Sequence, residues 1–328
     1  MASLLEHPTA QRLLDATTVA AAAIRAMVAR IDGYLERYRS GFVRSEQRDN
    51  AAVIVRGKLS GLERKTIEPI AAEAGVRRRA LQKFVGAGAW DDGAVRATLH
   101  AHVAAEIGDP AGVLIVDGMA VPKKGDASCG VARQWCGRLG KVDNCQTGVY
   151  LGYAARGGHA LLDGRLYLPQ DRAADPVHRA LTHVPAAVAF QEKWRLALAL
   201  IASVGPAVPH GWVVGDDEFG RASEFRLELR GLKQRYALDV PSTTSIRDLR
   251  APRPAGRRVP PWMSVAAWAA AQPKRAWRPW CATANGGRGG CGRFPRWCKP
   301  ATTAGTPARA NGWSSFAVAN RSRGRGTC

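Results

Sequence analysis

The chain has 328 residues, and 46% of them are hydrophobic, which is enough to bury a sizeable core and argues against disorder throughout. Its formal net charge of +21 implies a polyanionic partner, because such an excess of Lys and Arg repels itself unless phosphates or acidic lipids neutralise it, and nucleic acid is the first candidate. The amino end carries Glu6 and Asp15 rather than a basic stretch before an apolar one, and no run of eighteen apolar residues occurs, so we expect a cytoplasmic protein with no membrane partner.

The amino-terminal region has the periodicity of α-helices. Apolar residues recur at steps of three and four between Leu13 and Leu35, as they do on one face of an amphipathic helix. We therefore predict an α-helical amino-terminal domain over residues 1–105 and, because of the charge, we predict that it binds DNA.

Residues 70–84 have the shape of a helix-turn-helix. The small side chain of Ala71 would let two helices approach, Gly75 would turn the chain, and Leu81 and Phe84 would anchor the second helix. A helical hairpin with a solvated basic face fits the same pattern and stays open as an alternative. The DNA-contacting residues expected on the second helix are Arg77, Arg78 and Arg79.

From residue 110 onward the pattern changes to short apolar runs separated by Gly-rich turns, which predict strands. Strands are predicted at residues 111–116, 130–135, 148–153, 161–169, 212–216 and 236–240, and helices at 184–204 and 222–230. Consecutive strands followed by strands that alternate with helices indicate an α/β domain over residues 106–278, with a mixed sheet flanked by helices.

Two aspartates stand at the carboxyl ends of predicted strands, Asp117 after residues 113–116 and Asp216 after residues 212–215. Such strand ends converge on a crevice in open α/β sheets, so the two carboxylates could share a cation. Mg²⁺ prefers carboxylate oxygens, water and phosphate, and a pair of such ions, roughly 3.5–4 Å apart, can activate an attacking hydroxyl and stabilise the leaving oxygen of a phosphodiester. An Asp at a strand end is also a common turn former or helix cap, so the pattern alone leaves both interpretations open.

The last part of the chain departs from ordinary composition. Residues 251–328 contain twelve Arg, two Lys and no Asp or Glu, whereas a folded domain normally carries charges of both signs. A basic nucleic-acid-binding tail and out-of-frame translation of GC-rich DNA are the two explanations, and the scattered Gly, Trp and Cys from residue 280 onward favour the second. We predict a disordered basic tail over residues 279–328.

The seven cysteines never form a C-x-x-C pair, so we interpret them as reduced thiols rather than zinc ligands. We expect Cys136 and Cys145 to be buried small apolar residues, because no histidine is placed in sequence to form a dyad with either.

Several segments together closely resemble the insertion-sequence transposases known as DDE superfamily endonucleases, and their order and spacing agree with that family. The resemblance runs from about Tyr34 to Arg278. The segments are 116–125 (VDGMAVPKKG), 130–137 (GVARQWCG), 143–150 (DNCQTGVY), 166–169 (LYLP), 216–220 (DDEFG) and 266–270 (AAWAA).

The resemblance implies a ribonuclease-H-like catalytic domain in which Asp117 and Asp216 match the first two catalytic and metal-binding carboxylates. It implies Mg²⁺ (or Mn²⁺) as the cofactor and double-stranded DNA, both the terminal repeats of the element and the target, as the partner. It leaves a homodimer open. Contacts to phosphates or DNA ends are implied for Lys123, Lys124 and Arg133, although ordinary solvated charges would look the same in sequence.

The third carboxylate of the family is a Glu on a later helix, and this chain has no Glu after Glu228. If the codons for residues 280–286 are translated in the frame that starts two bases later, they can encode Val-Arg-Asp-Gly-Glu-Arg. That peptide resembles what the family has after Trp277, so we hypothesise a frame change near Arg278. Glu218 could replace the lost acid, but a role in capping the next helix is the simpler interpretation. The sequence thus predicts a transposase whose present copy is defective in catalysis. A DNA-binding remnant that never cuts is the alternative, and a general RNA-binding protein is disfavoured because no stacking aromatic motif accompanies the basic residues.

Overall fold

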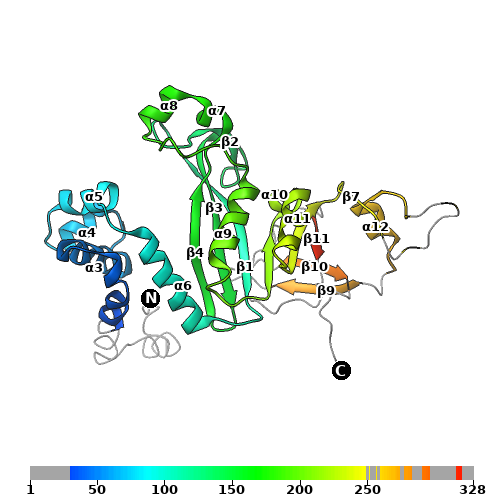
Figure 1. The fold of residues 1–328 in the computed structure, drawn as a ribbon, viewed down its shortest axis with the longest axis horizontal. Helices are drawn as coiled ribbons and strands as arrows, with labels where there is room; N and C mark the ends of the chain where they lie inside the picture. The colour runs from blue at the N-terminus through cyan, green and yellow to red at the C-terminus, as the bar shows by residue number, and fades with distance from the viewer. Residues whose placement is uncertain are drawn as a thin grey trace, which may run out of the picture. The chain divides into compact units, whose positions relative to one another are not determined.

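A computed structural model describes residues 30–248, 251, 256 and 259–273, together with the backbone of three later strands at 277–282, 290–295 and 315–319. The chain divides into two compact units, Met1–Leu99 and His100–Cys328 (Figure 1). No helix in the part of the chain that the structure describes is long and apolar enough to cross a membrane.

The first unit is helical, as predicted, although most of the segment from Leu13 to Leu35 lies outside the described residues. A helix at residues 30–37 and a short 3₁₀ turn precede three helices and the start of a fourth. Their bounds are η2 Arg39–Gly41, α3 Ser45–Leu59, α4 Ile67–Glu73, α5 Arg78–Ala87 and α6 Asp92–Ile107.

Helices α4 and α5 form the predicted helix-turn-helix shape. Gly75 has a φ of 65°, a conformation that L side chains rarely adopt, and it lets the chain turn after α4. Ile70 and Ala71 of α4 pack with Leu81 of α5, and all three are buried. Phe84, also on α5, packs in a second cluster, which is aromatic and includes Tyr38 and Phe42. The predicted packing of the two helices is therefore confirmed. Binding of DNA by the second helix stays a prediction.

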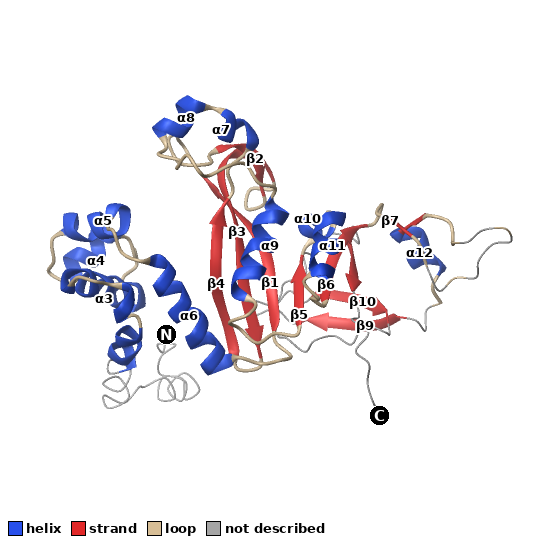
Figure 2. Cartoon of the chain, in the orientation of Figure 1, coloured by secondary structure: helices blue, strands red, loops and turns tan. Residues whose placement is uncertain are grey.

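The second unit contains a mixed sheet in the order β11-β6-β5-β1-β3-β2, with β4 also paired to β3 (Figure 2). Strands β1, β3 and β4 are antiparallel neighbours, whereas β5 and β6 continue the sheet from β1 in parallel. The bounds are β1 Val113–Pro122, β2 Ala132–Cys136, β3 Lys141–Ala155, β4 Gly158–Leu166, β5 Trp212–Gly215 and β6 Tyr236–Pro241. This arrangement confirms the predicted α/β class and is consistent with a ribonuclease-H-like fold.

One face of the central strands forms the core of this unit. Leu114 lies opposite Tyr153 and Val116 opposite Leu151, and residues opposite one another on antiparallel strands point to the same face. These side chains are buried, and helix α9 (Lys193–Val204) packs against β3 and β4. Burial of each large aliphatic side chain contributes about 1.5–3 kcal/mol, so this layer supplies much of the stability of the sheet.

Shorter elements surround the sheet. Two small helices follow β4, two follow β5, and a two-stranded ribbon with one more helix follows β6. These are α7 Gln170–Ala174, α8 Pro176–Leu181, α10 Asp217–Gly220, α11 Ser223–Gly231, β7 Ser245–Ile246, β8 Met263–Ser264 and α12 Val265–Ala271.

Three predicted boundaries are wrong, and one of them is the start of β3, which lies at Lys141 rather than at residue 148. Strand β1 does not end before Asp117 but continues to Pro122, because its antiparallel pairing with β3 runs through Asp117 and Tyr150. The helix predicted over residues 184–204 begins only at Lys193. His183 has a φ of 53°, and Pro185 has no N–H to donate to a helix, so the apolar residues before Lys193 form a loop.

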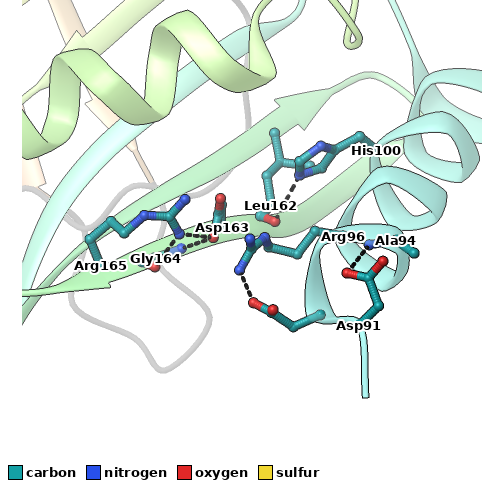
Figure 3. A network of polar contacts seen from close by, with 9 residues as sticks. Asp91, Ala94, Arg96, His100, Leu162, Asp163, Gly164 and Arg165 are labelled. Atoms are coloured by element: carbon teal, nitrogen blue, oxygen red, sulfur yellow. Dashed lines mark hydrogen bonds and ion pairs between the residues drawn. The ribbon is translucent and has the colours of Figure 1, made fainter. Parts of the chain in front are cut away.

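A buried polar contact joins α6 to β4 within the second unit (Figure 3). His100, which is buried, places Nε2 3.1 Å from the backbone oxygen of Leu162. Next to it, the buried carboxylate of Asp163 accepts hydrogen bonds from the Arg165 guanidinium and the Gly164 N–H, both at 2.8 Å. A buried carboxylate needs such partners, so this group helps to fix the bulged pairing of β3 with β4.

Most of the segment 279–328 lies outside the described residues. Within and beside it, the structure describes a β9–β10 hairpin (Trp277–Ala282 with Gly290–Pro295) and strand β11 (Ser315–Ala319), which pairs antiparallel with β6. For the remainder, the predicted disorder of the tail stays a prediction.

Candidate catalytic site

The pairing of β1 with β5 brings the two predicted aspartates to the same level of the sheet. Val116 is the register partner of Gly215, and this is the last pair that the two parallel strands form. Asp117 and Asp216 follow directly on these two residues. The convergence that the sequence predicted is thus observed, although Asp117 lies inside β1 rather than at its end.

Asp216 begins the turn of helix that follows β5. It is the N-cap of α10, and its Oδ1 accepts a hydrogen bond of 3.1 Å from the Glu218 N–H. Part of the side chain reaches solvent, yet the loss of surrounding water and then the nearby negative charges of Asp117 and Glu218 raise its pKa to about 6. Two carboxylates that repel each other in this way define an electronegative point at the centre of the sheet.

Glu218 lies beside this pair but is already engaged. Its Oε1 is 2.5 Å from Lys193 Nζ at the start of α9, and both side chains are partly buried. A Cβ added at Gly118 would lie 2.8 Å from Glu218 Oε2, so the lack of a side chain at Gly118 gives this carboxylate its space. Glu218 lies in the first turn of α10, where a negative charge is expected to stabilise the helix, and its ion pair also ties α10 to α9.

One acidic residue near the pair was missed by the sequence reasoning. Asp239 of β6 follows Leu238, which pairs with Gly215. It therefore lies on the neighbouring strand, at the level of Asp216. Burial, and then the charge of Asp217, raises the pKa of Asp239 above its usual range. An isolated acid in the otherwise apolar run of residues 236–240 was the signal that could have identified it.

The donors at this point suit a divalent cation only in part. Oxygen ligands of opposite charge are what Mg²⁺ prefers, and the mutual repulsion of Asp117 and Asp216 would be relieved by one. Within the described ranges, however, no group of three or more His, Cys, Asp or Glu side chains is arranged to hold a metal ion. The pair is therefore an incomplete set of ligands.

Three further predicted residues lie around Asn144. Arg133 of β2 is its register partner, and the Asn144 side-chain amide donates to the backbone oxygens of Lys123 and Gly125, each at 3.0 Å. Arg133 and Lys124 are exposed, and Lys123 is half-buried. The structure thus gathers Lys123, Lys124 and Arg133 near the end of β1 that pairs with the start of β3.

The three arginines predicted to contact DNA lie at the start of α5, in the other unit, and all are exposed. Arg77 is the N-cap residue of that helix, and Arg78 forms an ion pair of 2.7 Å with Glu68. Exposed ion pairs contribute little, so Arg78 is only weakly held. Cys136 and Cys145 are buried free thiols, as predicted.

A sheet consistent with a ribonuclease-H-like fold that places two acidic residues side by side is an arrangement suited to metal-assisted chemistry on phosphodiester bonds. Among known protein families, the one described as DDE superfamily endonuclease matches residues 37–289. The chain belongs to the DDE superfamily endonucleases, a superfamily that acts on DNA and generally uses divalent metals. No curated protein matches the chain.

Proposed function

We propose that the protein is the transposase of a bacterial insertion sequence. It would bind the terminal repeats of its element, cleave phosphodiester bonds there and join 3′-hydroxyl ends to target DNA. The observation that carries this proposal is the placement of Asp117 and Asp216 side by side on β1 and after β5, with the pKa of Asp216 raised by the charge of Asp117. Membership of the DDE superfamily endonucleases supports the same reaction class.

Asp117 and Asp216 are the residues that would hold Mg²⁺ (or Mn²⁺). Bound there, the ion would supply an activated water or hydroxyl and stabilise charge on the leaving oxygen. The chain's own contribution is to place the two carboxyl groups side by side, Asp117 on β1 and Asp216 directly after β5. Burial around Asp216 opposes ionisation of its carboxyl group, and a bound cation would stabilise the ionised form.

We propose further that this copy cuts DNA poorly or not at all. Residues 229–328 contain no Glu, and Glu218, the acid nearest the pair, is held by Lys193. The match to the family ends at residue 289, inside the segment whose composition departs from that of a folded domain. A frame change near Arg278 would account for the missing third carboxylate.

The second candidate function is a DNA-binding remnant that occupies element ends without cutting them. It is favoured by the exposed arginines of α5, which need no metal and no third carboxylate to contact phosphates. Such binding would weaken steeply with salt because each neutralised phosphate releases counterions.

A plasmid-nicking assay on the full chain tests these proposals. In EDTA, we expect salt-sensitive binding to duplex DNA. With Mn²⁺ or Mg²⁺, we expect this chain to nick supercoiled DNA no faster than its Asp117→Asn variant. A second chain is made by shifting the reading frame by two bases after codon 278. It should gain metal-dependent cleavage, and Asp117→Asn should abolish that cleavage.

The remaining outcomes separate the candidates. Cleavage that stays absent in the frame-restored chain supports the remnant. Cleavage by the present chain that is lost with Asp117→Asn contradicts the proposed defect and leaves the transposase intact. Failure to bind duplex DNA at low salt would contradict both candidate functions.

A further inference from the structure

A cleft of about 550 Å³ adjoins the paired aspartates. It is lined by residues of β2, of the loop that follows β4 and of the start of α9, and Glu218 of α10 forms part of its wall. Glu218 links the cleft to the aspartates, because it lines the cleft and its backbone N–H donates to Asp216 Oδ1 at 3.1 Å. A strand whose phosphate lies at the aspartates would therefore lie close to this cleft. The volume is in the range that holds a small-molecule-sized group rather than a duplex.

Two aromatic side chains line the cleft, Tyr167 and Trp194. The Tyr167 ring meets Phe190 edge-on at a centroid distance of 6.3 Å, and Lys193 Nζ lies 5.3 Å from its centroid. Its backbone N–H donates to the Thr147 oxygen at 2.9 Å, so the loop that carries the ring is anchored to β3. Burial, and then the surrounding carboxylates, raise the pKa of the Tyr167 hydroxyl, which keeps it a neutral hydrogen-bond donor.

The charges of the cleft decide which part of a nucleotide it fits. Both cations and carboxylates line the wall, and Lys193 is already paired with Glu218 at 2.5 Å. Glu192 is paired at 2.7 Å with Arg195, which does not line the cleft. A phosphate deep inside would meet these carboxylates at a cost, whereas a base brings polar edges and no charge. Arg133, which is exposed, is the cation best placed to meet a phosphate from outside.

We propose that this cleft receives an unpaired base of the DNA strand that the site processes. The base packs against Tyr167 and against the part of the Trp194 ring that is not covered by the Arg195 guanidinium, which lies 4.5 Å from the ring centroid. The sugar–phosphate backbone stays at the rim near Arg133. A paired and stacked base cannot enter, because its faces and its Watson–Crick edge are occupied, so the occupant is a base at a strand end or one taken out of the helix. Recognition by stacking tolerates any base. This inference rests on the proposed function for its choice of DNA.

The test compares two mixed-sequence DNAs bound by the full chain in EDTA, a blunt duplex and the same duplex with a single-stranded overhang. We expect the wild-type chain to prefer the overhang. Tyr167→Leu and Trp194→Leu should each reduce that preference about fivefold or more, the scale of one lost base–aromatic contact. Trp135→Leu is the matched control, because Trp135 is 58% exposed on β2 and is not among the residues that line the cleft, so it should keep the preference.

A second measurement does not depend on substitutions. An overhang that carries 5-iododeoxyuridine is photo-crosslinked to the wild-type chain, and the crosslinked peptide is expected to contain residue 167 or 194. Crosslinks at Trp135, or an unchanged preference in both cleft variants, would overturn the inference. Wild-type binding to both DNAs without preference also overturns it while leaving the proposed function standing, whereas binding to neither overturns the proposed function itself.

Discussion

Asp117 and Asp216 occupy equivalent positions on neighbouring parallel strands, each directly after the last residue, Val116 or Gly215, that β1 and β5 hold in register. Asp117 lies within β1 and Asp216 caps the helix that follows β5, so the register of the two strands brings the two residues to the same level of the sheet. The pKa of Asp216 is raised to about 6, first by burial and then by Asp117. This relationship makes the site testable by its response to pH, to cations and to the loss of either acid.

The first prediction concerns the pH dependence of stability. A carboxyl group whose pKa is higher in the folded chain stabilises the fold below its ordinary value of 3.8, and this contribution is lost as the pH rises through about 6. Asp216→Asn cannot ionise and still caps a helix, so it should melt roughly 1–3 °C above the wild-type chain at pH 7.5, a modest gain because solvent screens part of the charge. At pH 4, the two melting temperatures should coincide.

Thermal melts across this pH range measure the effect. Asp126→Asn, in an exposed loop, is the control and should run parallel to the wild-type chain. An Asp216→Asn curve that is parallel to the wild-type curve would show that Asp216 is not perturbed by its neighbours.

The second prediction concerns cations. If Asp117 and Asp216 share a divalent ion, Mn²⁺ at about ten times its dissociation constant should raise the free energy of unfolding by roughly 1.4 kcal/mol. Asp117→Asn should lose most of this gain, because one carboxylate and a neutral amide bind a hard cation weakly. Melting with Mn²⁺ and with EDTA measures it, and an equal gain in the variant would place the ion elsewhere.

The third prediction tests the packing of the helical unit. A Cβ added at Gly57 of α3 would lie 2.5 Å from Ile70 Cγ2, which is buried in the core of the helix-turn-helix. Gly57→Ala should therefore destabilise this unit by about 1–2 kcal/mol despite the better helix propensity of Ala. Gly86→Ala, on α5, meets no described atom within 4 Å and should stabilise by about 0.5–1 kcal/mol. Urea unfolding of the two variants measures both effects, and equal stability of the two would contradict the observed packing.

The fourth prediction separates a DNA-binding helix from a solvated basic face. If α5 contacts phosphates, Arg79→Gln should weaken duplex binding and reduce the slope of log affinity against log salt by about one. Arg78→Gln should have a smaller effect, since Arg78 already pairs with Glu68. Arg39→Gln, an exposed arginine paired with Glu36 on another segment, is the control. The same loss in Arg39→Gln as in Arg79→Gln would favour the solvated face.

Patterns local in the sequence were enough for much of this protein. The helix-turn-helix pattern predicted that Ala71 and Leu81 would lie where two helices approach across a turn at Gly75, and the structure shows them packed together. The apolar runs before Asp117 and Asp216 predicted two strands of one sheet, and the motifs around them predicted the family that the comparison confirmed.

Other features depended on residues far apart in sequence. The extent of β1 beyond Asp117 is set by its pairing with β3, and no property of residues 117–122 alone reveals that partner.

By itself, the sequence determined the fold class, the two acids and the absence of a later Glu, since all of these can be read from composition and short-range order. Only the tertiary structure decided that Lys193 holds Glu218, that Asp239 lies across the sheet from Asp216, and that Tyr167 and Trp194 line a cleft beside the acids. The physical reason is that ion pairs and clefts arise where separate elements pack together, and packing is determined by the whole fold rather than by any one segment.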